Sequence, residues 1–193
     1  MMRLLTSIAA ALVMIFAHSA AAADLSAGQI ERFVASLDDL REFGARLEAE
    51  GKQADAFEDL APAPGEPFRP YTRGTEYLRE IGEYGAFEQI VRRHGFSDGA
   101  AWAETGDRVM VAFMANLMER ENPQAAQMAA SMSPEMLDQM PPAMRERMAG
   151  VMAMVTTMLN APPEDRAAVA PFMDRIEAWM ESQGGGRPSF GPN

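Results

Sequence analysis

The sequence predicts an all-α fold, built as a single-domain irregular bundle of about six or seven helices. Apolar residues recur at three-and-four spacing through most of the chain, which is the period of one buried helix face. Alternating apolar and polar runs bounded by turn residues, the pattern of strands, do not occur. Prolines recur through the second half of the chain, and because proline interrupts a helix we expect the helices there to be short.

The first residues predict a secretory signal peptide over residues 1–23. Arg3 precedes an apolar run from Leu4 to Ala17, and the small residues that follow it end in Ala21, Ala22 and Ala23 before Asp24. That run of about 14 residues is shorter than the roughly 20 that a membrane-spanning helix needs. We therefore expect a soluble protein, exported to the periplasm without a membrane span.

The helical domain is expected over residues 24–183, and Ser26 is the expected cap of its first helix. Gly51 is the expected end of that helix, and a short acidic helix over residues 54–60 follows. Residues 61–70 hold four prolines and a glycine and predict an extended loop packed over the bundle.

The helical period returns from Thr72 and is expected to break near Gly82 and Gly85. It ends at His94-Gly95, after which Ser97-Asp98 caps the next helix. The apolar stripe of that helix runs from Trp102 to Leu117, and the helix should stop at Asn122-Pro123.

The second half is expected to consist of helices that begin or end at proline. These starts are predicted at Ser133-Pro134, Pro141-Pro142, Pro162-Pro163 and Pro171. The glycine-rich residues 184–193 predict a disordered tail.

Charge and cysteine content exclude several classes of function. The net charge is -11, and no basic face is visible that could neutralise phosphates, so nucleic acid is not an expected partner. The chain has no cysteine, which excludes disulfides, thiolate metal sites and covalently attached c-type haem.

Methionine stands at every fourth position from Met128 to Met152. The prolines divide this run among separate helices, where each subset forms an ordinary apolar stripe. Between Asn122 and Asn160 there are nine methionines and only four other large aliphatic residues. Our first interpretation is a core packed with adaptable thioether side chains.

A second interpretation is a flexible face for an apolar protein or peptide partner, as in a chaperone-like binding module. Its residues would be Met128, Met132, Met136 and Met140. The alternative is a Cu(I) site, because thioethers are soft ligands and two of them four residues apart share a helix face. Its residues would be Met144, Met148, Met152 and Met154, and Met110, Met114 and Met118 repeat the spacing. No other cofactor is expected.

An enzyme is not expected, because the chain has no glycine-rich phosphate loop and no nucleophile elbow. His94 fits a helix C-terminus better than a haem ligand. Asp38-Asp39 predicts a solvated helix face. The polar stretch from Glu104 to Arg108 could line a small pocket, although Asp107 and Arg108 are more simply surface charges.

Four stretches resemble a group of small uncharacterised exported helical proteins of Gram-negative bacteria. They are SAGQIERFVASLDDLREFG, HGFSDGAAWAETGDRVMVAFM, SPEMLDQM and PPEDRAAVAPFMDRIEAW. The resemblance implies compartment and fold only, and no activity or site residue comes with it.

Overall fold

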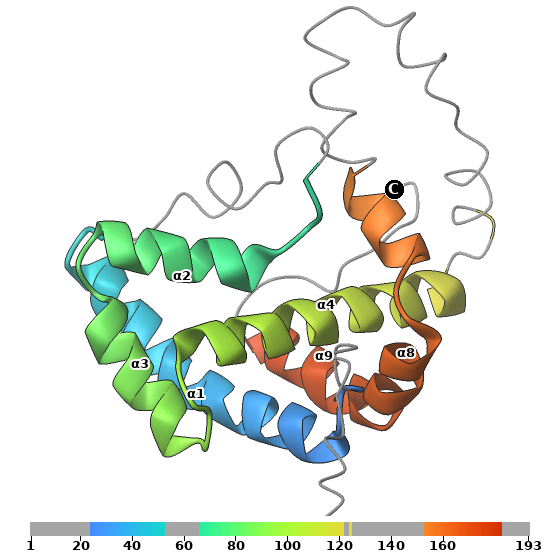
Figure 1. Ribbon diagram of the computed structural model, residues 1–193, viewed down its shortest axis with the longest axis horizontal. Coiled ribbons are helices and arrows are strands. Elements are labelled where there is room, and N and C mark those ends of the chain that lie inside the picture. Colours follow the sequence, from blue (N-terminus) through green and yellow to red (C-terminus); the bar gives the residue numbers. More distant parts are fainter. Residues whose placement is uncertain (1–23, 53–65, 122–123, 125–152, 183–193) are drawn as a thin grey trace, which may run out of the picture.

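The structure is a computed structural model that describes residues 24–52, 66–121, 124 and 153–182 (Figure 1). All regular elements in these residues are helical, as the sequence predicts. The predictions of a signal peptide, of the helix at 54–60, of most of the proline-rich loop and of the tail lie outside the described residues.

Helix α1 (Ala27–Ala49) begins and ends where the sequence predicts. The Ser26 hydroxyl accepts the Gln29 backbone N–H, and the Gln29 side chain accepts the Ser26 backbone N–H at 3.0 Å, which completes a capping box. Gly51 follows the helix with φ of 69°, a left-handed conformation that glycine adopts at little cost. The capping box and the glycine each involve only neighbouring residues, so both ends of the helix can be predicted from the sequence.

Helices α2 (Pro70–Glu80) and α3 (Tyr84–Arg93) form the predicted interrupted pair. The break lies at Gly82, whose φ is 75°, whereas Gly85 lies inside α3. Helix α2 starts two residues before the predicted Thr72, because proline suits the first helical position. His94 caps α3 at its C-terminus, as predicted.

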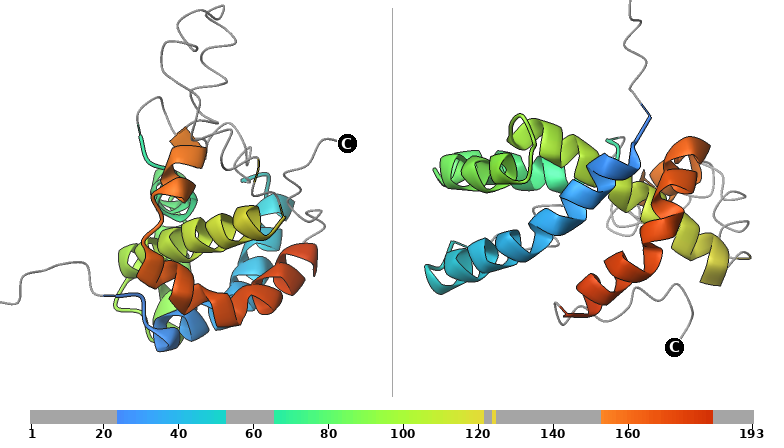
Figure 2. Two further views of the ribbon diagram at one scale, coloured as in Figure 1. Left: turned by 90° about the vertical axis from the view of Figure 1, so that its right-hand side faces the viewer. Right: turned by 90° about the horizontal axis from the view of Figure 1, so that it is seen from below.

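Helix α4 (Gly99–Glu121) is the central element and packs against α1, α2, α3 and α8 (Figures 1 and 2). The Asp98 carboxylate accepts the Ala101 N–H at 2.8 Å, which confirms the predicted cap. Burial extends beyond the predicted stripe to Ala103, Thr105 and Asp107. Because other helices pack around α4 on several sides, some of its polar positions are buried as well as its apolar stripe.

Four aromatic rings form the centre of the main core where α1, α2, α3 and α4 meet. Phe33, Tyr71 and Phe87 each place a ring centroid 5.1–5.3 Å from that of Trp102. The Trp102 indole N–H donates to the Ser36 hydroxyl at 2.8 Å, and that hydroxyl donates to the Phe33 carbonyl. Offset and edge-to-face rings with satisfied polar atoms stabilise such a core.

The C-terminal part folds back against α4. Residues 153–159 are helical, and α8 (Pro163–Val169), the 3-10 turn η1 (Ala170–Phe172) and α9 (Met173–Ser182) follow. Pro163 opens α8 as predicted, and Pro171 lies in the turn that leads into α9. A second, smaller core forms from Val111, Ala115, Met118, Met158 and Ala161.

Ion pairs connect α1 to the α2–α3 region. Glu83 accepts from Arg46 at 2.8 Å and from Lys52 at 2.6 Å, and these bonds lower its pKa to about 2. The His94 ring lies 3.0 Å from Asp39 rather than on the α3 carbonyls, so Asp39 is not a simply solvated charge. Asp38 is exposed as expected.

Helices able to cross a membrane are not found in the described part of the chain.

Gly106 is a position where α4 tolerates no side chain. A Cβ there would lie 2.7 Å from the Phe33 ring and 2.9 Å from the Tyr71 ring, and Phe33 is buried. We predict that Gly106→Ala lowers the free energy of unfolding by about 1–3 kcal/mol, because the rings must move apart. The measurement is urea unfolding followed by circular dichroism.

Gly44 provides the matched control. It lies within α1, and a Cβ there meets nothing within 4 Å. Gly44→Ala should raise the free energy of unfolding by roughly 0.5–1 kcal/mol through helix propensity. Equal effects of the two substitutions would contradict the close packing at Gly106.

Candidate functional site

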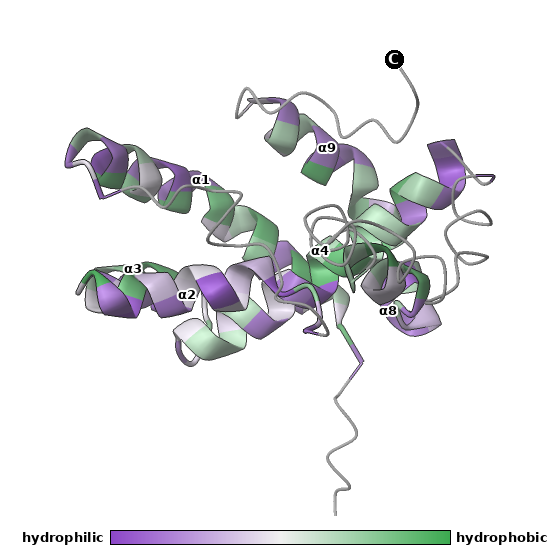
Figure 3. Ribbon diagram, turned by 90° about the horizontal axis from the view of Figure 1, so that it is seen from above, coloured by the Kyte–Doolittle hydropathy of each residue, from purple (hydrophilic) through white to green (hydrophobic). Residues whose placement is uncertain are grey.

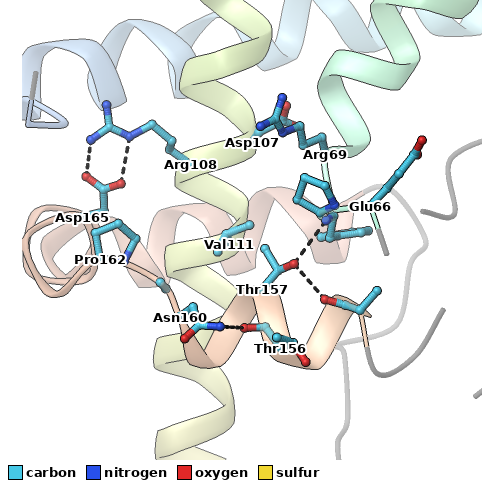
Figure 4. Close-up of a pocket in the computed structure, with 14 residues that line it drawn as sticks. Glu66, Arg69, Asp107, Arg108, Val111, Thr156, Thr157, Asn160, Pro162 and Asp165 are labelled. Atoms are coloured by element: carbon cyan, nitrogen blue, oxygen red, sulfur yellow. Dashed lines mark hydrogen bonds and ion pairs between the residues drawn. The ribbon is translucent and has the colours of Figure 1, made fainter. Parts of the chain in front are cut away.

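One cavity of about 780 Å³ lies between α4, α8, residues 66–69 and the helix at 153–159; we call it the α4–α8 cleft (Figure 4). Phe68, Val111 and Ala153 supply apolar walls, and Asp107, Arg108 and Asp165 supply charged ones. Asp107 and Arg108 belong to the polar stretch from Glu104 to Arg108 that was predicted to line a pocket or to be surface charges, and these two residues do line a pocket.

Asp107 is 7% exposed, so its interpretation as a surface charge is wrong. Its carboxylate accepts the Tyr71 N–H at 2.8 Å, the Thr72 N–H and the Thr72 hydroxyl. Burial raises the pKa of Asp107, and these hydrogen bonds oppose part of the rise. Asp107 therefore caps the N-terminus of α2 from a different helix, where free N–H groups favour an acceptor.

Arg108 is also paired within the fold, and it too was wrongly interpreted as a simple surface charge. Its guanidinium donates two bonds to Asp165, of 2.8 Å and 2.5 Å, and Asp165 is 1% exposed (Figure 4). The bidentate geometry joins α4 to the first turn of α8. A carboxylate so deeply buried requires this partner.

The uncharged polar groups of the α4–α8 cleft are likewise bonded to the protein. The Thr157 hydroxyl accepts the Phe68 N–H and donates to the Ala153 carbonyl, and Asn160 donates to the Thr156 carbonyl (Figure 4). The Thr157 bond thus joins residues 66–69 to the helix at 153–159, whereas the Asn160 bond is local.

A second cavity of about 720 Å³ lies between α1, α2 and α9, over the aromatic core; we call it the aromatic pocket. In the view from above, α1 and the α2–α3 pair extend from α4 toward the same side of the molecule (Figure 3). Apolar and aromatic side chains dominate its lining, among them Leu40, Phe43, Tyr71, Leu78, Trp102 and Trp179.

The two tryptophans of the chain both line the aromatic pocket, and they differ in hydrogen bonding. Trp102 donates to Ser36, as described above. The Trp179 Nε1 is buried and has no acceptor in the described part of the chain. Buried indole N–H groups normally find a partner, so Trp179 is an exception among the described residues.

The methionines proposed as site residues fall largely outside the described residues. This applies to Met128, Met132, Met136, Met140, Met144, Met148 and Met152. Met154 is described and packs, partly buried, against the second core with Met114. Met118 and Met158 are buried in the same cluster. Thus these four methionines pack against other side chains, and of the nine between Asn122 and Asn160 only Met154 and Met158 are described.

Carboxylate and histidine side chains do not gather into a group of three or more suited to a metal ion anywhere in the described ranges. The aromatic pocket is not predictable from the sequence pattern. Its residues belong to the apolar stripes of separate helices, and the local sequence does not contain the information about which stripes pack against each other.

Comparison of the chain with protein-family models, with curated proteins and with solved structures found no match.

The Arg108–Asp165 pair gives a direct test of how α4 and α8 are joined. We predict that Arg108→Met destabilises the fold by about 3–5 kcal/mol, because Asp165 keeps a buried charge without its partner. Adding Asp165→Asn removes that charge, so the double variant should recover part of the loss. Chemical denaturation at pH 7 measures both, and a double variant no more stable than the single would refute this account.

Proposed function

We propose that the protein is an exported, non-catalytic binding protein that holds an apolar ligand in the aromatic pocket. The observation that carries the proposal is a cavity of about 720 Å³ whose walls are mainly apolar and aromatic and include both tryptophans of the chain. Such cavities, largely apolar with a few polar groups, are typical ligand sites.

The chemistry of the charged residues supports binding rather than reaction. Asp107 and Arg108 each form hydrogen bonds with another segment of the fold, and Glu83 forms ion pairs with Arg46 and Lys52. A catalytic acid or base needs to reach a substrate proton, and these groups face the protein.

Export to the periplasm remains a prediction from the signal-like residues 1–23. The partner-binding face at Met128, Met132, Met136 and Met140 likewise stays a prediction.

Gly74 offers a way to block the aromatic pocket without disturbing the core. It lies in α2, lines the pocket, and a Cβ there meets nothing within 4 Å. We predict that wild-type protein binds the neutral apolar dye Nile red and that Gly74→Leu loses at least most of this binding, because the new side chain occupies the pocket. Dye fluorescence and energy transfer from tryptophan measure it.

Gly85→Leu is the matched control, because Gly85 is exposed, lies in α3 and is not among the lining residues. It adds the same side chain outside the pocket and should leave dye binding unchanged. Failure of the wild type to bind, or equal loss in both variants, would reject the proposal.

Cu(I) binding is the second candidate, and one observation favours it. The pairs Met114/Met118 on α4 and Met154/Met158 on the helix at 153–159 belong to one cluster. Each pair has the spacing that places two thioethers on one helix face. Neutral sulfur ligands in an apolar setting are the donors that Cu(I) prefers.

We predict for this candidate that anaerobic titration against a Cu(I) chelator shows stoichiometric binding that Met118→Leu/Met158→Leu abolishes. Leucine nearly conserves the volume of methionine, so the fold should survive. A Met144/Met148/Met152 triple leucine variant tests, in parallel, three of the four ligands that the sequence predicts. Absence of binding in the wild type removes copper from consideration.

A further inference from the structure

We propose that the ligand of the aromatic pocket is a lipophilic cation, a small molecule with one apolar body and one ammonium-type head that lies beside Glu48. The inference rests on the proposed binding function and narrows it to a chemical class.

The size and walls of the pocket require an apolar body. The volume of about 720 Å³ lies within the range of small-molecule sites, roughly 300–1,000 Å³. Leu40 and Phe43 of α1 and Leu78 of α2 are among the lining residues. An alkyl or aryl group placed against them would remove apolar surface from water on both partners.

Glu48 lies on the face of α1 that borders the pocket. The lining includes Leu37, Arg41, Gly44 and Glu48, and their spacing of four, three and four residues places them on one face of the helix. Glu48 is also exposed to solvent, so a ligand head at the opening of the pocket can approach its side chain. The carboxylate is therefore accessible from the pocket.

Two cations line the pocket, and the fold already compensates both. Arg41 pairs with Asp38 at 3.6 Å. Lys52 belongs to a balanced network of two cations and two carboxylates, which consists of Arg46, Lys52, Glu50 and Glu83. Neither lining cation is left to attract an anionic ligand.

Glu48 is the third charged residue of the lining, and no cation in the described part of the chain forms an ion pair with it. It lies in the last turn of α1, where the helix dipole is negative and gives a carboxylate no stabilisation. The net charge of -11 adds a general attraction for cations. The pocket thus carries one uncompensated negative charge, which favours a cationic head over a carboxylate.

The aromatic walls are compatible with a cationic head. The faces of aromatic rings carry partial negative charge and attract ammonium and guanidinium groups. Phe43 and Tyr77 line the pocket, and the Arg46 guanidinium carbon already lies 5.0 Å from the Phe43 ring centroid. The same faces would repel a carboxylate, so rings and charge favour the same class of ligand.

The test compares nonyltrimethylammonium, 1-nonanol and nonanoate at pH 7, which share an alkyl chain of equal length and differ in charge. Each displaces Nile red from the purified protein, far below the concentration at which the ligand forms micelles. At low salt we expect the cation to bind about fivefold more tightly than nonanoate. Added sodium chloride should narrow this difference, because it screens exposed charges.

Glu48→Gln is the deciding variant, because it removes the charge and keeps the shape of the side chain. Its affinity for the cation should fall about twofold to fivefold, the value of one exposed ion pair. Its affinity for 1-nonanol should not change, and its affinity for nonanoate should rise.

Glu42→Gln is the matched control. Glu42 is an exposed carboxylate of α1 that does not line the pocket, so the substitution changes the net charge equally and leaves the lining intact. It should keep the wild-type ratio of cation to nonanol affinity.

The outcomes separate this inference from the function on which it rests. Tighter binding of nonanoate than of the cation, a cation affinity that Glu48→Gln does not lower, or an equal loss in Glu42→Gln would overturn the inference. If Nile red binds and 1-nonanol displaces it while the cation does not, the inference fails and the binding function stands. If Nile red does not bind, both fail.

Discussion

Asp107 and Arg108 stand side by side in α4, the helix around which α1, α2, α3 and α8 pack. Successive residues of a helix point about 100° apart, so the two charges leave α4 in different directions. Asp107 caps α2, and Arg108 pairs with the buried Asp165 of α8. One turn of the central helix thus ties segments from both halves of the chain to the same core.

The aromatic pocket depends on this arrangement. By holding the first turn of α2, Asp107 places Tyr71 against Phe33 and Trp102, whose rings form the floor of the main core. At the other end of α1, Glu83 draws Arg46 and Lys52 toward the turn between α2 and α3. Polar contacts therefore hold the helices that border the pocket at both of its ends.

Four of the described methionines lie in the second core, whereas Met110 lines the aromatic pocket and Met173 is buried in the main core. Met114 and Met118 of α4 meet Met154 and Met158 of the helix at 153–159 in the second core. Unbranched side chains adapt to such an irregular junction better than leucine or isoleucine. Packing accounts for the sulfurs on its own, and a metal would need the same sulfurs to converge.

Local signals determined much of the helical pattern directly from sequence. Ser26, Gly82 and Asp98 set helix boundaries through hydrogen bonds or backbone angles that involve only their neighbours, so their types were sufficient. The roles of Asp107 and of the two tryptophans were decided by the tertiary structure alone. Trp102 and Trp179 are the same side chain on similar apolar stripes, but Ser36, 66 residues away in sequence, lies opposite only the first. Whether a buried group is satisfied depends on what another helix places beside it, and no local pattern contains that information.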